Sequence, residues 1–205
     1  MVYLHFKGEK MNMASRSKQV RLKKVTLNQY EALPENQTIE VFNGLISYMA
    51  NPSPLHHALV TELSNTFYTY IRNKNTDWQL FNTPFDAKYV KLSCRPLIIV
   101  HPDLMLICDT KKLDGKICNG APDFIIEVVS PSDLADDYIH KLYYYKIYGV
   151  REYWIVDIRR KTVTVNYFVN NLLNVQYSFD SVIKVNIFDD FYIDFCKITE
   201  SMQLE

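Results

Sequence analysis

The chain alternates between stretches whose apolar residues recur every three or four positions and short stretches that are almost continuously apolar. The first pattern is typical of helices that bury one face, and the second is typical of strands in a covered sheet. The spacing of three and four predicts helices over residues 26–33, 55–70 and 132–149. Strands are predicted over residues 39–49, 79–89, 96–108, 123–129, 152–158, 163–167, 175–179 and 182–188.

Local signals mark where several of these elements begin and end. Asn43-Gly44 is typical of a two-residue hairpin turn, because both residue types tolerate a positive φ. Ser53-Pro54 begins the second helix, and Ser132 or Asp133 caps the start of the third, which ends at Gly149. The strand before this third helix and the strand after it complete a strand–helix–strand unit.

The strand over residues 123–129 reads Asp-Phe-Ile-Ile-Glu-Val-Val, which predicts a central strand covered on both faces. Glu127 in such a strand costs free energy unless it is paired or binds a metal. Side chains alternate along a strand, so Asp123 and Glu127 share one face. Asp123 starts the strand, where an Asp commonly serves a turn, and we assign it a structural role.

Asp103 is a second acidic residue between apolar stretches, in a Pro-Asp step. Two strand carboxylates and a nearby lysine are the minimal set for metal-assisted hydrolysis of a phosphodiester. The usual spacing places the lysine two residues after the glutamate, but Val129 occupies that position. Lys141 on the following helix is the nearest substitute, although Asp137 one turn earlier is an equally good partner for it. The spacing alone leaves both interpretations of Lys141 open.

Length, charge and cysteine content limit the number of domains and the classes of function. The length suits one domain, which we place at residues 26–195, between an N-terminal arm of residues 1–25 and a tail of residues 196–205. Lys plus Arg and Asp plus Glu each number 23, which disfavours a DNA-coating protein but permits a local basic groove. The four cysteines form no CxxC pair, and no apolar run approaches the ~20 residues of a membrane helix. We therefore expect a cytoplasmic protein with free thiols.

Several short motifs occur in an order that is more specific than any one of them. They lie at residues 40–44, 53–56, 84–86, 102–103, 121–132, 137, 141, 145 and 149–157. In this order the chain resembles the Uma family of restriction endonucleases, which belongs to the PD-(D/E)xK nuclease superfamily. The resemblance runs from about Thr26 to Asp194 and covers nearly the whole chain.

The resemblance implies an α/β fold with a restriction-endonuclease-like core, in which helices flank a mixed central β-sheet and additional β-hairpins are attached. It implies that Asp103 and Glu127 bind a divalent metal, Mg²⁺ or alternatively Mn²⁺. It also implies that Lys141 has moved from the strand to the helix and assists the attacking water. DNA is then the expected substrate, and a homodimer would suit an enzyme that cuts both strands.

Glu40, His56 and Asp86 match family positions that line the same pocket, but each also has a local explanation. A hairpin Glu can lie on the surface, a His near a helix start can be satisfied there, and a turn Asp can bond the backbone. For His56 and Asp86 we favour the local explanation. His101 departs from the family pattern, and it is either a further metal ligand or a simple hydrogen-bonding residue.

Three functions therefore remain open. The leading one is a Mg²⁺-dependent endonuclease. The second is a non-cleaving nucleic-acid-binding module, which would use basic patches at residues 72–74, 111–112 or 159–161. The third is a protein-interaction module in which the two carboxylates merely pair with Lys141.

Overall fold

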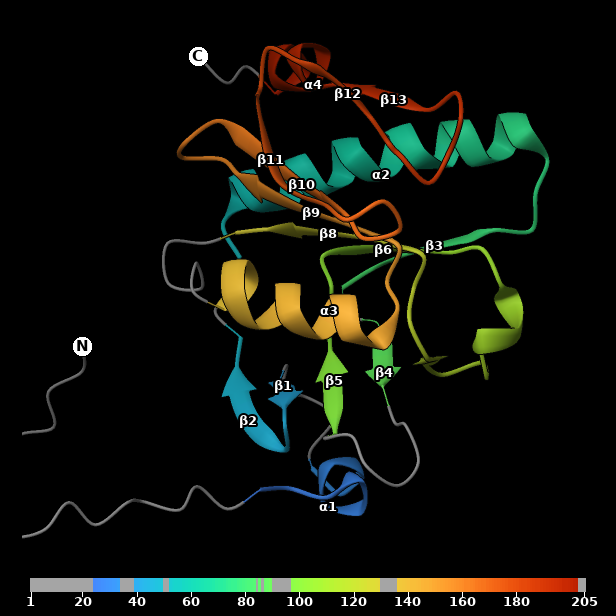
Figure 1. The fold of residues 1–205 in the computed structure, drawn as a ribbon, viewed down its shortest axis with the longest axis vertical. Coiled ribbons are helices and arrows are strands. Elements are labelled where there is room, and N and C mark those ends of the chain that lie inside the picture. The colour runs from blue at the N-terminus through green and yellow to red at the C-terminus, as the bar shows by residue number, and fades with distance from the viewer. Residues whose placement is uncertain are drawn as a thin grey trace, which may run out of the picture.

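A six-stranded mixed sheet forms the centre of the computed structural model, which describes residues 24–33, 39–49, 52–83, 85, 87–89, 97–129 and 136–202 (Figure 1). Its strand order is β11-β10-β9-β8-β6-β3. The strands are β3 (Gln79–Asn82), β6 (Leu104–Ile107), β8 (Phe124–Val128), β9 (Glu152–Asp157), β10 (Thr162–Tyr167) and β11 (Leu172–Ser178). β8 and β9 are parallel, while the other neighbouring pairs are antiparallel.

A second sheet has the order β2-β1-β5-β4-β7. Its strands are β1 (Ile39–Phe42), β2 (Leu45–Tyr48), β4 (Ala87–Tyr89), β5 (Ile98–Val100) and β7 (Cys118–Asn119). β1 and β2 form the predicted hairpin, in which Asn43 and Gly44 have φ values of 52° and 80°. Both residues of the turn therefore adopt the positive φ that the Asn-Gly pair favours.

Two of the predicted strands are wrong as single elements, because each divides between the two sheets. The run over 79–89 forms β3 in the central sheet and β4 in the second sheet, and the run over 96–108 forms β5 and β6 in the same way. Proline lacks the N–H that a ladder needs, so a central strand does not continue through it. Pro102 separates β5 from β6, and Pro84, between β3 and β4, lies outside the described residues.

The helices are α1 (Leu27–Glu31), α2 (Pro54–Lys74), the 3₁₀ turn η1 (Thr110–Lys112), the π-helical turn η2 (Asp136–Lys141), α3 (Leu142–Tyr148) and α4 (Phe195–Ser201). α2 buries Leu59, Leu63 and Phe67, as its predicted stripe requires. α4 lies where we predicted no element. It follows a hairpin of β12 (Val182–Lys184) and β13 (Tyr192–Asp194). Among the described helices, none has the length and apolar character to span a membrane.

Alternate side chains of the central strands enter two cores on opposite faces of the sheet. Phe124 and Trp154 pack with α2, α4 and the β12–β13 hairpin. Ile125 and Tyr153 pack with α3 and with β4, β5 and β7 of the second sheet. Figure 1 shows α2 and α3 on opposite sides of the central sheet, as the two cores require. The predicted fold class, a mixed sheet flanked by helices with added hairpins, is confirmed.

Glu152 is a buried carboxylate that links the C-terminal segment to the central sheet. Its Oε1 accepts hydrogen bonds from Trp154 Nε1 at 2.7 Å and Asn186 Nδ2 at 2.8 Å, and its Oε2 accepts one from the backbone N–H of Ile187 at 2.9 Å. Three donors therefore bond to the two oxygens of this buried carboxyl group. Glu152 therefore holds the segment between β12 and β13 against β9.

Candidate functional site

The antiparallel pairing of β6 and β8 brings the two predicted metal ligands together. Leu104 lies opposite Ile126, and continuing this register by one residue places Asp103 opposite Glu127. Opposed residues of an antiparallel pair point to the same side of the sheet. Both carboxylates therefore lie at one end of the central sheet, on the face that carries α3.

Asp103 is held by two contacts to the same oxygen. Its Oδ2 accepts a hydrogen bond from the backbone N–H of Val128 at 2.8 Å and lies 2.9 Å from Nε2 of His56. His56 stands in the first turn of α2, where its own backbone N–H donates to Oγ of the N-cap Ser53. The imidazole of His56 therefore contacts Asp103 and not the helix terminus, so the local explanation that we favoured for this side chain is wrong.

Glu127 is held by two side chains from the helical segment that follows β8. Its Oε1 lies 3.0 Å from Nζ of Lys141 and accepts a hydrogen bond from the hydroxyl of Tyr145 at 2.7 Å. The same ammonium lies 3.2 Å from Oε1 of Glu40. Glu40, Glu127 and Lys141 are only 5%, 3% and 5% exposed, so solvent screens these charges weakly.

The second sheet supplies Glu40, and this placement overturns the interpretation of Glu40 as a surface hairpin residue. β1 is the inner strand of the hairpin and pairs with β5, with Val41 opposite Ile99. Glu40 consequently points inward, and its Oε1 also accepts a hydrogen bond from the backbone N–H of His101 at 3.2 Å. Nε2 of His101 lies 2.9 Å from the carbonyl oxygen of Ile39, so this imidazole contacts the backbone in the structure.

A π-helical turn sets the direction of the two side chains that contact Glu127. Lys141 is the last residue of η2, and Tyr145 follows four residues later in α3. Residues four apart share one face of a helix, so both point toward the same carboxylate. π-Helical turns are rare and frequently occur at functional sites, which agrees with this position.

The structure brings together every predicted site residue that it describes, from five separate parts of the chain: Glu40, His56, Asp103, Glu127 and Lys141. Asp86 lies outside the described residues, and so do the predicted caps Ser132 and Asp133 and the side chain of Asp137.

Sequence reasoning missed the polar role of Tyr145, although it assigned this residue to the buried stripe of the helix. Tyr145 is fully buried as predicted, and its hydroxyl needs a partner there. The available signal was its position four residues after Lys141. Asp123 has the predicted structural role, because its Oδ2 accepts a hydrogen bond from the backbone N–H of Cys108 and its Oδ1 lies 3.4 Å from Nη1 of Arg151.

The donor set fits a hydrated divalent cation better than a closed metal cage. Within the described ranges, no three His, Cys, Asp or Glu side chains form a ready-made cage. Mg²⁺ prefers carboxylate oxygens and keeps several waters, so two opposed carboxylates suffice for it. Glu40, Glu127 and Asp103 carry three negative charges against the one positive charge of Lys141. Among the described residues of this cluster, the formal charges of the three carboxylates exceed that of Lys141 by two, and a divalent cation would offset this difference.

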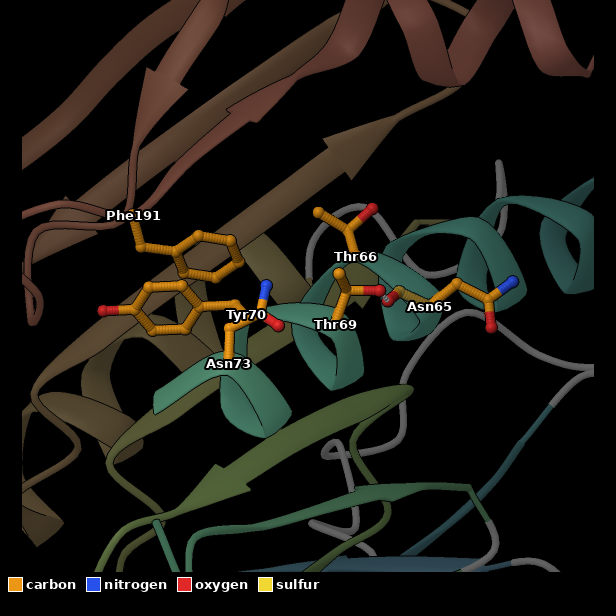
Figure 2. Close-up of a pocket in the computed structure, with 6 residues that line it drawn as sticks. All are labelled: Asn65, Thr66, Thr69, Tyr70, Asn73 and Phe191. Atoms are coloured by element: carbon orange, nitrogen blue, oxygen red, sulfur yellow. Dashed lines mark hydrogen bonds between the residues drawn. The ribbon is translucent and has the colours of Figure 1, made fainter. Parts of the chain in front are cut away.

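A separate hollow of about 450 Å³ lies on the outer face of α2 (Figure 2). It is lined by Asn65, Thr66, Thr69, Tyr70, Asn73 and Phe191. Tyr70 stacks on Phe191 with ring centroids 4.0 Å apart, which closes one end of it. None of the six lining residues carries a carboxylate, an imidazole or an amine, so this hollow lacks the groups that the predicted chemistry needs.

A family model and a solved structure both match this chain. The model of the Uma2 family, described as "Putative restriction endonuclease", matches residues 27–195. No curated protein matches the chain. A similar solved structure is described as "a putative nuclease belonging to DUF820 from Anabaena variabilis", with 16% sequence identity and a TM-score of 0.66. The match covers 86% of this chain and 98% of that one, and at this identity it establishes the shared fold.

Proposed function

This chain belongs to the Uma2 family, and we propose that it is a divalent-metal-dependent nuclease that hydrolyses phosphodiester bonds in DNA. The observation that carries the proposal is the convergence of Asp103, Glu127, Lys141 and Glu40 at one end of the central sheet. A buried charge is costly unless it is paired, and in the described part of this cluster three carboxylates share one lysine, which is an excess of formal negative charge. A divalent cation would offset that excess, and the bound cation would in turn attract the phosphate of a substrate.

In this proposal Asp103 and Glu127 hold Mg²⁺ or Mn²⁺. The ion would polarise the scissile phosphate and acidify a water when bound. His56 and the backbone N–H of Val128 fix the rotamer of Asp103 through Oδ2, which directs its other oxygen away from those contacts. The Tyr145 hydroxyl restrains Glu127 in the same way.

Lys141 has the role of positioning the attacking water and offsetting the charge that develops on the phosphate. Glu40 shares the ammonium of Lys141 and so prevents it from neutralising Glu127 completely. Glu40 therefore has two roles. It fixes the direction of the lysine side chain, and it keeps the site negative enough to attract a cation.

The direct test uses purified protein with Mg²⁺ or Mn²⁺ on plasmid and linear DNA. We expect cleavage that Asp103→Asn and Glu127→Gln each abolish. Asp123→Asn is the matched control, because it removes a carboxylate of similar burial, 8% exposed, near the opposite end of β8. Equal cleavage by the wild type and both site variants would identify a contaminant, and equal loss in the control would indicate damage to the fold.

A non-cleaving nucleic-acid-binding module is the second candidate, and one observation favours it. Lys141 already bridges two carboxylates, and Oδ2 of Asp103 is occupied by His56 and Val128, so the cluster has internal partners for its charges. A fold does not guarantee activity. Calorimetry separates the two candidates: DNA binding without measurable Mg²⁺ or Mn²⁺ binding supports the module and removes the nuclease.

We also propose that the protein acts as a cytoplasmic homodimer. Cys108, Cys118 and Cys196 are free thiols among the described residues, which suits a reducing compartment, whereas Cys94 lies outside them. A dimer would supply two active sites, so that both strands of a duplex could be cut in one binding event. Light scattering on the purified protein tests the oligomeric state, and a monomer at all concentrations would contradict it.

A further inference from the structure

We propose that the loop joining β9 to β10, residues 158–161, binds the phosphodiester backbone of the nucleic-acid substrate beside the candidate site. The inference rests on the proposed nuclease function and adds the surface that holds the substrate. The loop carries three successive basic residues, Arg159, Arg160 and Lys161, and all three are exposed. The chain as a whole has no net charge, so binding to a phosphate backbone depends on a local basic surface near the candidate site and not on the net charge of the protein.

The parallel pairing of β8 and β9 puts this loop at the same end of the sheet as the candidate site. Glu127 lies opposite Ile155, and both strands run toward the same end. At ~3.3 Å per strand residue, Arg159 lies up to ~13 Å beyond the level of Glu127. That reach corresponds to roughly four phosphates along one strand, at ~3.4 Å each. A backbone bound at the site therefore passes within reach of the loop.

The other basic patches lie elsewhere. Lys111 and Lys112 follow the carboxyl end of β6, whereas Asp103 precedes its amino end, so these lysines occupy the opposite end of the sheet. Lys112 is also engaged by the carbonyl oxygen of Ala121 at 2.8 Å. Arg72 lies roughly 24 Å along α2 from the first turn that carries His56, at ~1.5 Å per residue. Of the three basic patches, the β9–β10 loop is therefore the one that lies beside the candidate site.

The loop is held in shape without using all of its positive charge. Oδ1 of the buried Asp157 accepts a hydrogen bond from the backbone N–H of Arg160 at 2.9 Å, and its Oδ2 lies 3.7 Å from Nε of Arg160. Arg159 and Lys161 have no ion-pair partner within the described part of the chain. Two cations are therefore presented to solvent on a preformed loop, which lowers the entropic cost of binding a phosphate backbone.

Lys161 gives a second indication, because its backbone conformation does not favour lysine. Five described non-glycine residues have positive φ, and four of them are asparagines: Asn43, Asn75, Asn171 and Asn174. The fifth is Lys161, with φ of 51°. Asn tolerates this region better than other non-glycine residues, so a lysine here is kept at a conformational cost. Its charge explains that cost if the side chain contacts the substrate.

The test measures binding of labelled duplex DNA to the full chain by fluorescence anisotropy, in EDTA so that cleavage is off, over a series of salt concentrations. The double variant Arg159→Gln/Lys161→Asn removes two charges and places a more favourable residue at the positive φ. We expect about tenfold weaker binding per charge at ~0.1 M salt, and a salt slope shallower by about 1.8. The matched control, Lys111→Asn/Lys116→Asn, removes the same charge from two exposed lysines in the segment between β6 and β8.

An unchanged slope in the loop variant, or an equal loss in the control, would overturn the inference while leaving the nuclease proposal standing, provided that the wild type cuts DNA. A wild type that neither binds nor cuts DNA would refute both. A loop variant that keeps its thermal stability but raises the KM for cleavage, with kcat unchanged, would support the inference, because the loop then contributes to binding and not to the chemical step.

Discussion

Replacing Lys141 by methionine would remove the ammonium that lies between the buried carboxylates of Glu40 and Glu127. Nζ of Lys141 lies 3.0 Å from Glu127 and 3.2 Å from Glu40. At an effective dielectric constant of about 20, each contact represents ~5 kcal/mol of Coulomb attraction, which the desolvation of the ammonium partly offsets. Breaking one partner of a buried ion pair typically costs ~3–5 kcal/mol, and we expect a loss of that size.

The loss is measurable by urea or thermal unfolding. For a chain of this length, each kcal/mol lowers the Tm by about 2–4 °C, so Lys141→Met should melt roughly 6–20 °C below the wild type. The double variant Lys141→Met/Glu40→Gln removes one of the opposed carboxylate charges as well, and it should recover a large part of that loss. A single variant within ~1 kcal/mol of the wild type would refute the description of Lys141 as the buried link between the two carboxylates.

A melting temperature alone does not separate a catalytic Lys141 from a structural one, because its burial predicts destabilisation in both cases. Added Mg²⁺ does separate them. An ion bound only by the folded state raises stability by RT ln(1 + [L]/Kd), or ~2.7 kcal/mol at 100 times the Kd. If Mg²⁺ binds Glu127, it should stabilise Lys141→Met more than it stabilises the wild type, where the ammonium competes for the same oxygen. Equal shifts would show that the ion and the lysine do not share this carboxylate.

Three further changes test other parts of the structure. Tyr145→Phe removes the hydrogen bond to Glu127, so we expect ~1–3 kcal/mol lower stability in urea unfolding and weaker Mn²⁺ binding by calorimetry; unchanged Mn²⁺ binding would exclude a positioning role. Gly149→Ala imposes a side chain at φ of 99°, which should cost ~1–2 kcal/mol through backbone strain alone, because nothing lies within 4 Å of the added Cβ; an unchanged midpoint would contradict this. Burial raises the pKa of the Glu152 carboxyl although its hydrogen-bond donors lower it, so the folded state retains a proton that the unfolded state releases above about 4.5. Stability of the wild type relative to Glu152→Gln should therefore fall as the pH rises from that value, and a constant difference would refute the reasoning.

Much of the fold was predictable from the sequence, because its main elements depend on local patterns. The apolar run of β8 predicted a covered strand, and the spacing of Leu59, Leu63 and Phe67 predicted a buried helix face. The Asn43-Gly44 pair predicted a tight hairpin turn. The division of two predicted strands between two sheets was not predictable in the same way. Which sheet a short strand joins depends on distant partners, and a local pattern carries no information about them.

The site was predictable where burial made a charge costly, and less so where position depended on tertiary structure. Glu127 was identified because a carboxylate in an apolar strand needs a partner. Glu40 had a surface alternative, because a four-residue strand pattern does not reveal which strand of a hairpin lies inside a sheet. The structure shows that β1 pairs on both sides, with β2 and with β5, and this pairing turns Glu40 inward.

The position of the lysine on a helix follows from the packing around β8. Val129 stands where the usual spacing places the lysine, and it packs in the apolar core with Tyr145 and Ile155. A lysine in place of Val129 would bury its ammonium among these apolar side chains, which costs free energy. A lysine on η2 reaches the same carboxylate with its stem against the core and its ammonium between two acids. The proposed chemistry requires only a positive charge beside Glu127, so a lysine on the helix can supply it, and Glu40 from the second sheet is the second carboxylate that contacts this lysine.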